Sequence, residues 1–321
     1  MLNNKTVLVT GGTGSFGNIF VSEILKKYKI KKVIVFSRDE YKQFLMRKKI
    51  KDKRLRYFLG DVRDAERLHR ALHGVDIVVH AAALKQVPPL EYNPFEAIKT
   101  NVIGAENIIN AALDNKVKHV LALSSDKAVN PINLYGASKL CADKMFVAAN
   151  AYSGDIKTKF SVVRYGNVFN SRGSVVPFFK EQKKTGILTI TDKRMTRFWI
   201  TLNQSANFVL KCLKLMRGGE IFIPKIPSMK IIDLAKVIAP KCNYKIIGIR
   251  PGEKLHEVLI PADESRNVFM AKIMYIILTP FRSTRGYGYC RKVKDGFTYS
   301  SDSNDQWLTK VQLRKIMQNE L

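Results

Sequence analysis

The chain has 321 residues, 46% of them hydrophobic and 26% charged, and a formal net charge of +28, proportions that indicate a soluble globular protein. Its four cysteines are widely spaced without a CxxC pair, which argues against a disulfide framework and against a metal site. The N-terminus lacks a signal-peptide layout and the apolar run 273–278 is too short to cross a bilayer, so we expect a cytoplasmic protein with no membrane partner.

The first half of the chain alternates short apolar runs with longer amphipathic stretches. Predicted strands cover 5–10, 32–37, 55–59, 76–80, 119–124 and 160–165. Predicted helices cover 15–27, 40–49, 64–72, 94–114 and 134–149. Strands that are apolar throughout and separated by helices predict a parallel sheet covered on both faces. The expected fold class is therefore α/β, a Rossmann-like doubly wound sheet.

Beyond about residue 168 the predicted elements become shorter and no second nucleotide fingerprint occurs. We expect a dinucleotide-binding domain over 1–168 and a smaller, mixed α/β, mainly substrate-binding region over 169–321. A predicted helix within 200–218 is expected to pack back on the first domain. The polar, basic stretch 282–303 is expected to form a mobile loop.

The turn after the first predicted strand carries the spacing GxxGxxG at Gly11, Gly14 and Gly17. In dinucleotide-binding folds the first glycine permits the tight turn, the second lets the backbone approach the pyrophosphate, and the third allows close helix packing. The start of the next helix offers free N–H groups to the phosphates. Gly11, Thr13, Gly14, Ser15, Phe16 and Gly17 are therefore candidate cofactor-binding residues.

The end of the second predicted strand, Ser37-Arg38-Asp39, bears on the choice of dinucleotide. Arg38 offers a forked cation to a 2′-phosphate, whereas Asp39 suits a ribose diol, so NADP is favoured over NAD. Asp61 and Val62 follow the third strand and are candidate adenine contacts, although Asp61 could instead cap the helix that follows. Ala81 and Ala82 follow the fourth strand and are small enough for a cofactor to lie over them.

A further group of polar residues follows the fifth predicted strand. Ser125 ends that strand, and Tyr135 and Lys139 lie four residues apart on the next helix, so they share one face. A lysine there can lower the pKa of the tyrosine, whose phenolate then accepts a hydroxyl proton while hydride leaves the same carbon. These three residues are candidate catalytic residues of an oxidoreduction step.

With these motifs in place, the chain resembles the extended short-chain dehydrogenases/reductases. It is most similar there to the inverting UDP-N-acetylglucosamine 4,6-dehydratases of pseudaminic acid biosynthesis. The resemblance covers about residues 4–265, through strings such as TGGTGSFG, FSRDE, HAAALK, SSDKAVNPINLYGASK, MTRFWIT and RPGEKLHEV. The stretch 268–299 matches poorly, and Gln86 stands where relatives often carry histidine.

The resemblance implies a reaction and roles for Asp126 and Lys127. Oxidation of UDP-GlcNAc at C4 acidifies C5–H; neutral Lys127 would remove that proton, and protonated Asp126 would supply one to the departing C6 hydroxyl. Both protonation states require shifted pKa values. Hydride then returns to C6 and C5 is inverted. The alternative for this pair is a helix cap or a loop ion pair.

The resemblance also assigns Lys85 to the cofactor and the substrate. It implies substrate contacts for Asn167, near Arg164, and for Arg197, Arg250 and Glu253, whose alternative is structural salt bridges. Arginine forks suit a diphosphate. It further implies a homo-oligomer.

Two alternative functions stay open. One is a UDP-sugar 4-epimerase or a capsule-pathway dehydratase/epimerase, and the other is a non-catalytic nucleotide- or nucleic-acid-binding protein, suggested by the net charge. The basic clusters at 26–32, 47–56 and 282–294 match no nucleic-acid-binding signature, so we expect them on solvated helix faces and expect no nucleic-acid partner.

Overall fold

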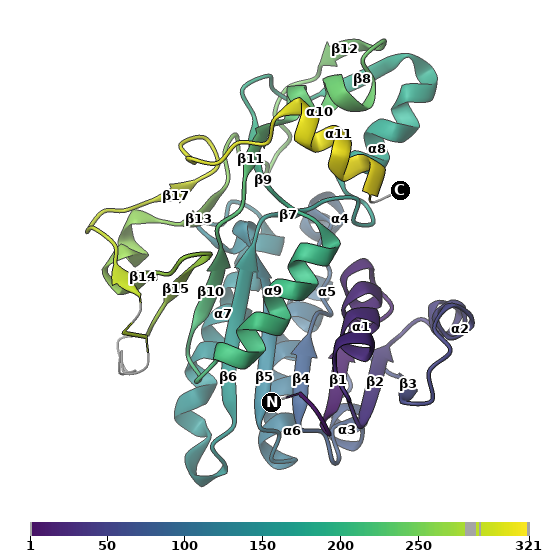
Figure 1. Ribbon diagram of the computed structural model, residues 1–321, viewed down its shortest axis with the longest axis vertical. Coiled ribbons are helices and arrows are strands. Elements are labelled where there is room, and N and C mark those ends of the chain that lie inside the picture. Colours follow the sequence, from purple (N-terminus) through teal and green to yellow (C-terminus); the bar gives the residue numbers. More distant parts are fainter. Residues whose placement is uncertain (1, 280–286, 289, 320–321) are drawn as a thin grey trace.

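The computed structural model describes residues 2–279, 287–288 and 290–319. Its main sheet has the strand order β16-β14-β15-β10-β6-β5-β4-β1-β2-β3 (Figure 1). The pairs from β10 to β3 are parallel, and β15, β14 and β16 add an antiparallel edge. This order, with helices between the parallel strands, confirms the doubly wound fold.

The strands of this sheet are β1 (Thr6–Thr10), β2 (Lys32–Ser37), β3 (Leu55–Leu59), β4 (Ile77–His80), β5 (His119–Ser125), β6 (Lys159–Tyr165), β10 (Ile221–Pro224), β14 (Val268–Met270), β15 (Met274–Ile277) and β16 (Arg291–Lys292). The helices of the first half are α1 (Ser15–Lys27), α2 (Glu40–Lys49), α3 (Ala65–Ala71), α4 (Val87–Tyr92), α5 (Pro94–Ala97), α6 (Gly104–Asp114) and α7 (Leu134–Tyr152). A short 3-10 turn, η2 (Asp126–Ala128), joins β5 to the loop before α7.

The helix predicted over 94–114 is interrupted. Between α5 and α6 the chain forms a π-helical segment, η1 (Ile98–Ile103). Inside it, the buried Asn101 side chain accepts from Leu84 N at 2.9 Å and donates to Leu84 O at 2.9 Å and to Ser138 Oγ at 3.0 Å. Such segments occur frequently at functional sites. Asn101 thereby ties the loop after β4 to α7.

A second hydrophobic core lies above the carboxyl ends of the parallel strands (Figure 1). It is formed by α8 (Val175–Gln182), β8 (Ile187–Ile190), β9 (Thr196–Ile200), β11 (Ser228–Lys230), α10 (Ile231–Ile238) and α11 (Lys310–Asn319). Three small sheets, β11-β9-β7, β12-β8 and β13-β17, use in addition β7 (Asn167–Val168), β12 (Asn243–Ile246), β13 (Val258–Ile260) and β17 (Tyr299–Ser300). The region expected from residue 169 onward is therefore not continuous, because β10, β14, β15 and β16 belong to the main sheet.

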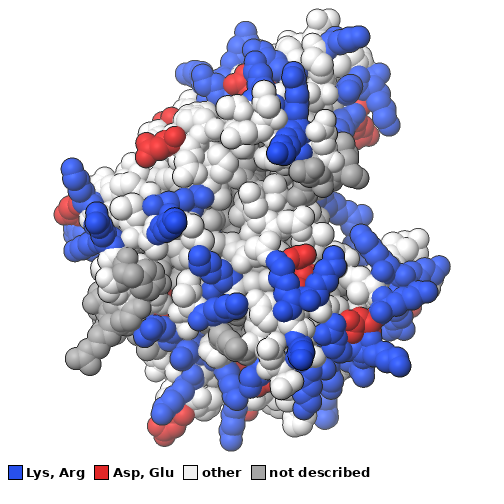
Figure 2. All heavy atoms as spheres, in the orientation of Figure 1, with Lys and Arg blue, Asp and Glu red and all other residues white. Residues whose placement is uncertain are grey.

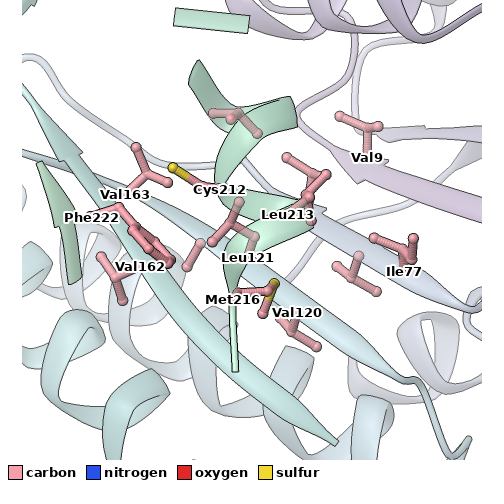
Figure 3. Close-up of a cluster of buried hydrophobic side chains, with 14 of the residues drawn as sticks. Val9, Ile77, Val120, Leu121, Val162, Val163, Cys212, Leu213, Met216 and Phe222 are labelled. Atoms are coloured by element: carbon pink, nitrogen blue, oxygen red, sulfur yellow. The ribbon is translucent and has the colours of Figure 1, made fainter. Parts of the chain in front are cut away.

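Helix α9 (Leu202–Leu215) lies against the main sheet and not against the second core. Its buried residues Cys212 and Leu213, with Met216 just beyond its end, lie among Val120, Leu121 and Val162 of the sheet (Figure 3). A capping box at Thr201 and Gln204 begins the helix. The chain thus returns to the first core between two segments of the second, which fixes the two regions against each other.

Basic side chains are spread over most of the visible face and do not gather on one element (Figure 2). Part of the stretch 282–303 lies outside the described residues. Near the end of this stretch, Tyr299 is buried and donates to Ile226 O at 2.9 Å. Tyr299 belongs to the strand β17, so this part of the stretch is not the expected loop. Among the described residues, no helix is both long and apolar enough to cross a membrane.

Candidate active site

The glycine turn joins β1 directly to α1. Gly11 has φ +63°, and a Cβ there would lie 2.9 Å from the backbone N of Ala82. A Cβ on Gly17 would lie 2.4 Å from Gly12 O, so the helix packs on the turn itself. Gly14 is the N-cap of α1, and no described side chain caps it, which leaves first-turn N–H groups open to an anion. The turn therefore fits the pyrophosphate of a dinucleotide.

The remaining residues of the turn are held by short contacts. Thr13 O accepts from the side chain of Asn18 at 2.9 Å. Ser15 Oγ accepts from the backbone N of Arg172 at 3.1 Å, which brings the loop before α8 onto the turn. Phe16 stacks on Phe20 at 5.4 Å between ring centroids.

At the end of β2, the two candidate selectors of the dinucleotide have different partners. Arg38 is half-exposed and lies 3.5 Å from Asp61 Oδ2. Asp39 is the N-cap of α2, where its carboxylate accepts from the backbone N of Lys42 at 2.9 Å and also pairs with the Lys42 ammonium. Ser37 is buried and its Oγ accepts from Gln43 at 3.1 Å.

A cavity of about 430 Å³ lies beside these residues, lined by Thr13, Asp39, Lys42 and Arg172 among others. The cap of α3 is Asp64 and not Asp61, because Asp64 accepts from Arg67 N, while Asp61 accepts from the backbone and guanidinium of Arg63. Val62 is buried against Gly104.

The loop after β4 is tied to β1. Thr10 Oγ1 bonds His80 Nδ1 at 2.8 Å and accepts from the backbone N of Ala81 and Ala82 at 3.1 and 3.2 Å. Burial lowers the pKa of His80 to about 3, so this imidazole is neutral. Lys85 follows in the same loop. Partial burial of its ammonium and the charge of Lys127 lower its pKa.

Ser125, Tyr135 and Lys139 meet where β5 ends and α7 begins. Lys139 is buried and donates to Leu123 O at 2.7 Å. Burial raises the pKa of Tyr135 to about 12, opposed by the Ser125 hydrogen bond and by the charge of Lys127. The expected lowering of the Tyr135 pKa by Lys139 is therefore wrong for this structure, since the ammonium is turned to the Leu123 carbonyl and burial outweighs the opposing charges.

Asp126 and Lys127 form an ion pair in η2, with Lys127 Nζ 2.9 Å from Asp126 Oδ1. Asp126 is fully buried, and its Oδ1 also accepts from Ser125 Oγ at 2.8 Å. Burial alone would lower the pKa of Lys127, but the carboxylates of Asp126 and Glu257 outweigh it and raise that pKa. Lys127 is thus charged here, and not the neutral amine expected of a base.

Of the candidate substrate contacts, Asn167 lies closest to this pair, since its Oδ1 accepts from Lys127 Nζ at 2.7 Å. Arg197 is buried and donates to the carbonyls of Thr196 and Lys254 at 2.7 and 2.8 Å, with Glu253 Oε1 at 3.5 Å.

The contact between Arg197 and Glu253 is a structural salt bridge, which was the alternative to a substrate contact for these two residues. Arg250 is exposed. Arg164 lies away from the opening, fully buried beside Asp143 and Glu264.

Two buried residues that help to build the site were not among the candidates. Glu257 is buried within 3.4 Å of Lys127, and Asn101 anchors the loop before Lys85. The string RPGEKLHEV contains Glu257, but nothing in its spacing distinguishes this carboxylate from Glu253. The helical pattern over 94–114 gave no sign that Asn101 faces inward to the loop.

The arrangement combines two chemistries at the carboxyl ends of β1, β4 and β5. The glycine turn offers N–H groups to a diphosphate, and Tyr135 with Ser125 can exchange a proton with a hydroxyl. The Asp126–Lys127 pair can exchange two further protons. Such a site can oxidise an alcohol and, beside it, remove and add protons.

Comparison with known proteins gives a consistent result. The profile of a family described as "Polysaccharide biosynthesis protein" matches residues 7–278. The chain is 53% identical to the UDP-N-acetylglucosamine 4,6-dehydratase (inverting) of Campylobacter jejuni, over 99% of this chain and 98% of that protein. Among solved structures, Pen from Bacillus thuringiensis is 40% identical with a TM-score of 0.93, covering 100% of this chain and 99% of that one.

The Streptomyces venezuelae dTDP-glucose 4,6-dehydratase DesIV, solved with NAD and TYD bound, is 25% identical with a TM-score of 0.71, covering 78% of this chain and 86% of that one. These matches confirm the resemblance to extended short-chain dehydrogenases/reductases.

Proposed function

Because this chain belongs to the polysaccharide biosynthesis protein family, we propose that it dehydrates UDP-N-acetylglucosamine with inversion at C5. The product would be UDP-2-acetamido-2,6-dideoxy-β-L-arabino-hex-4-ulose. The observation that carries the proposal is the Asp126–Lys127 pair, 2.9 Å apart, next to Ser125. An enzyme that only oxidises or epimerises C4 does not need this second pair of proton-transferring groups.

The glycine turn and the cavity beside α2 support NADP as the resident cofactor. The dinucleotide, when bound, supplies the acceptor for the C4 hydride and the donor of a hydride to C6. Gly11, Gly14 and Gly17 would hold its pyrophosphate. Because Asp39 is engaged as the cap of α2, it is poorly placed to take a ribose diol, whereas Arg38 remains half-exposed for a 2′-phosphate. NADP is therefore favoured over NAD.

Tyr135 would move the proton of the C4 hydroxyl. It can accept that proton only as a phenolate, which requires its pKa to fall from about 12. The groups in this structure that act in that direction are the Ser125 hydroxyl and the Lys127 ammonium. Lys139 would contribute by holding the end of β5 through Leu123.

Asp126 and Lys127 would carry out the elimination. Transfer of one proton from Lys127 to Asp126 along their contact gives a neutral amine and a carboxylic acid. The amine takes the C5 proton and the acid gives its proton to the C6 hydroxyl, which leaves as water. The pair then returns to the ion pair of this structure, with protons and charges balanced. Inversion requires that C5 be reprotonated on the opposite face.

The UDP group would lie between the two regions. Arg250 is exposed and would turn to the diphosphate, and Asn167, whose Oδ1 accepts from Lys127 Nζ, would contact the sugar. Arg197 and Glu253 lie against each other and would reach the substrate only by giving up that contact. Lys85 would contact both cofactor and sugar. We further propose that the product enters pseudaminic acid synthesis for surface glycans. The homo-oligomer, the cytoplasmic location and the domain boundary at 168 stay predictions.

The test is the fate of a label at C4. UDP-GlcNAc carrying deuterium at C4 is incubated with the purified protein and NADP, and the product is examined by NMR and mass spectrometry. We expect loss of water and the label at C6. A 4-epimer with the label still at C4 would contradict the proposal and support the epimerase alternative. Unchanged substrate together with steeply salt-dependent DNA binding would support the non-catalytic alternative.

A further inference from the structure

Glu257, which precedes β13, is a buried carboxylate with no role in the function proposed above. It is 2% exposed, and its Oε2 has no hydrogen-bond partner among the described residues. A buried charge is retained in proteins only where it is paired, and an unsatisfied polar atom in such a place needs an explanation. Its surroundings supply one.

Three cations converge on this carboxylate. Two come from other segments of the chain, and the third comes from the segment of Glu257 itself. Oε1 lies 3.4 Å from Lys127 Nζ and 3.7 Å from Arg197 Nε, and Oε2 lies 4.0 Å from Lys254 Nζ. The Lys127 ammonium is therefore shared between Asp126 on one side and Glu257 on the other. Charges at these separations in a water-poor site interact strongly.

The backbone of Glu257 is fixed independently of Lys127. Glu257 N donates to Ser301 Oγ at 2.9 Å, and Ser301 N donates to Glu257 O at 2.8 Å. Ser301 Oγ also bonds Thr196 Oγ1 at 2.7 Å, next to Arg197. The C-terminal segment and β9 thus hold Glu257 in place, while Lys127 sits in a short 3-10 turn with its side chain 22% exposed. Glu257 is the fixed member of the contact and Lys127 the adjustable one.

We propose that Glu257 is a positioning residue for Lys127. The Glu257 carboxylate holds the Lys127 ammonium beside Asp126 and keeps it protonated until the proton passes to Asp126. The inference rests on the proposed role of Lys127 as the base for C5. In this arrangement Glu257 opposes loss of the proton to solvent and thereby sets the pH above which the Lys127–Asp126 pair no longer holds the proton that it must pass on. It touches neither sugar nor cofactor in this role.

The other charged groups around Lys127 are known, so the effect of removing Glu257 has a definite sign. Asp126 in the same turn raises the pKa of Lys127 and Arg197 from β9 lowers it. The remaining neighbours are Lys254, Lys85 and Tyr135. The charge of Lys127 acts to lower the pKa of each of them. Glu257→Gln keeps the shape and removes one negative charge, so the pKa of Lys127 falls. An opposite charge within about 4–6 Å shifts a pKa by about one to three units.

The experiment measures the reactivity of the Lys127 amine in the full-length protein without substrate. Trace acetic anhydride is added at about pH 8, and labelling of the Lys127 peptide is quantified by mass spectrometry. Because only the neutral amine reacts, one unit of pKa is about a tenfold change in rate. We expect Glu257→Gln to raise Lys127 labelling about tenfold or more. The alkaline limb of the pH–rate profile for dehydration, where the Lys127–Asp126 pair loses its shared proton to solvent, should move to lower pH by the matching amount.

The matched control is Glu220→Gln. Glu220 is also buried, but it accepts from Ser161 and from the backbone of Gly218 toward the amino end of β6, whereas the site lies at the carboxyl ends of the strands. Its substitution should leave Lys127 labelling unchanged. Glu257→Asp keeps the charge on a side chain one methylene shorter and should label at a rate between wild type and Glu257→Gln, so it serves as the test if the Gln variant does not fold.

Equal labelling in wild type and Glu257→Gln would overturn the inference. So would an equal rise in Glu220→Gln, which would indicate loosening of the fold, or the same high rate in Glu257→Asp. Labelling does not depend on turnover. A protein that labels as expected but does not dehydrate UDP-GlcNAc would thus contradict the proposed function alone.

Discussion

Two clusters of buried charge lie close to each other in this fold, and they differ in whether their groups can exchange a proton. The site cluster consists of Asp126, Lys127, Arg197 and Glu257. The inner cluster consists of Ser124, Asp143, Arg164 and Glu264. Each cluster keeps one member that is 22% exposed, Lys127 in the site cluster and Glu264 in the inner cluster, while Asp126, Asp143 and Arg164 are at most 2% exposed.

The difference separates a structural role from a chemical one. Arg164 Nη1 donates to Glu264 at 2.7 Å, and Asp143 accepts from Ser124 at 2.6 Å, so the inner cluster joins β5, β6 and α7. Each cluster also leaves buried atoms without a hydrogen-bond partner among the described residues: Oδ2 of Asp126 and Oε2 of Glu257 in the site cluster, and Nε of Arg164 in the inner cluster. Neither burial of charge nor an unpaired atom identifies a reaction centre in this protein; the lysine–aspartate contact of the site cluster can pass a proton, whereas the guanidinium of Arg164 cannot lose one.

The largest expected effect is that of Lys127→Ala on catalysis. Removal of the candidate base should lower the rate of dehydration by about 10²–10⁴-fold, the usual contribution of a general base, while NADP still binds. Product formation by NMR and cofactor binding by calorimetry measure the two effects. A variant that keeps the wild-type rate would show that the site cluster is as structural as the inner one.

Arg164→Met should act on stability in the first place. Breaking a buried ion pair by removing one partner costs about 3–5 kcal/mol, since Asp143 and Glu264 would remain without the cation. Urea unfolding followed by circular dichroism measures the loss. A large drop in the rate of the folded variant with little change in its unfolding free energy would instead place Arg164 in the chemistry.

Gly136→Ala tests how the turn of the site cluster is held. A Cβ on Gly136 would lie 2.2 Å from Lys127 O, so α7 and η2 would have to move apart. We expect a loss of about 1–3 kcal/mol in unfolding free energy, as for other overpacked sites, together with a lower rate. The matched control is Ala137→Gly on the same helix turn, which should affect the rate much less. A second glycine, Gly74, is unsuitable as a control because its φ is positive and an alanine there would be strained.

His80→Gln tests a buried titratable group that belongs to neither cluster. The folded protein keeps His80 neutral with a pKa of about 3, whereas the unfolded chain takes up a proton near pH 6.5. The stabilisation from the neutral imidazole is therefore full above about pH 6.5 and is lost as the pH falls toward 3, by about 1.4 kcal/mol per pH unit. Unfolding free energies measured from pH 7 to 4 should fall less steeply in the variant. Parallel curves would contradict the assignment.

Sequence patterns predicted the parts of the molecule that local interactions determine. The bounds of α1, α2, β2 and β3 agree with the periodicity and the glycine turn, because each depends on neighbouring residues. The candidate residues Ser125, Asp126, Lys127 and Tyr135 are also close in sequence, so one strand end and one helix start bring them together.

The rest depends on contacts between distant segments. Glu257 reaches Lys127 only because β9, β13 and the C-terminal segment pack on η2, and no periodicity records that packing. Arg164 was expected near the substrate, but the alternation of β6 points it inward to Asp143. The interruption of the helix at 98–103 follows from the Asn101 side chain, which pairs with a loop from another strand.

The central claim, that Lys127 and Asp126 exchange protons at C5 and C6, is tested most directly by the reaction of UDP-GlcNAc in deuterated water. NMR of the product should show one deuterium at C5 and the inverted C5 configuration. A dehydrated product that retains the C5 configuration, or that carries hydrogen from the substrate at C5, would contradict the account.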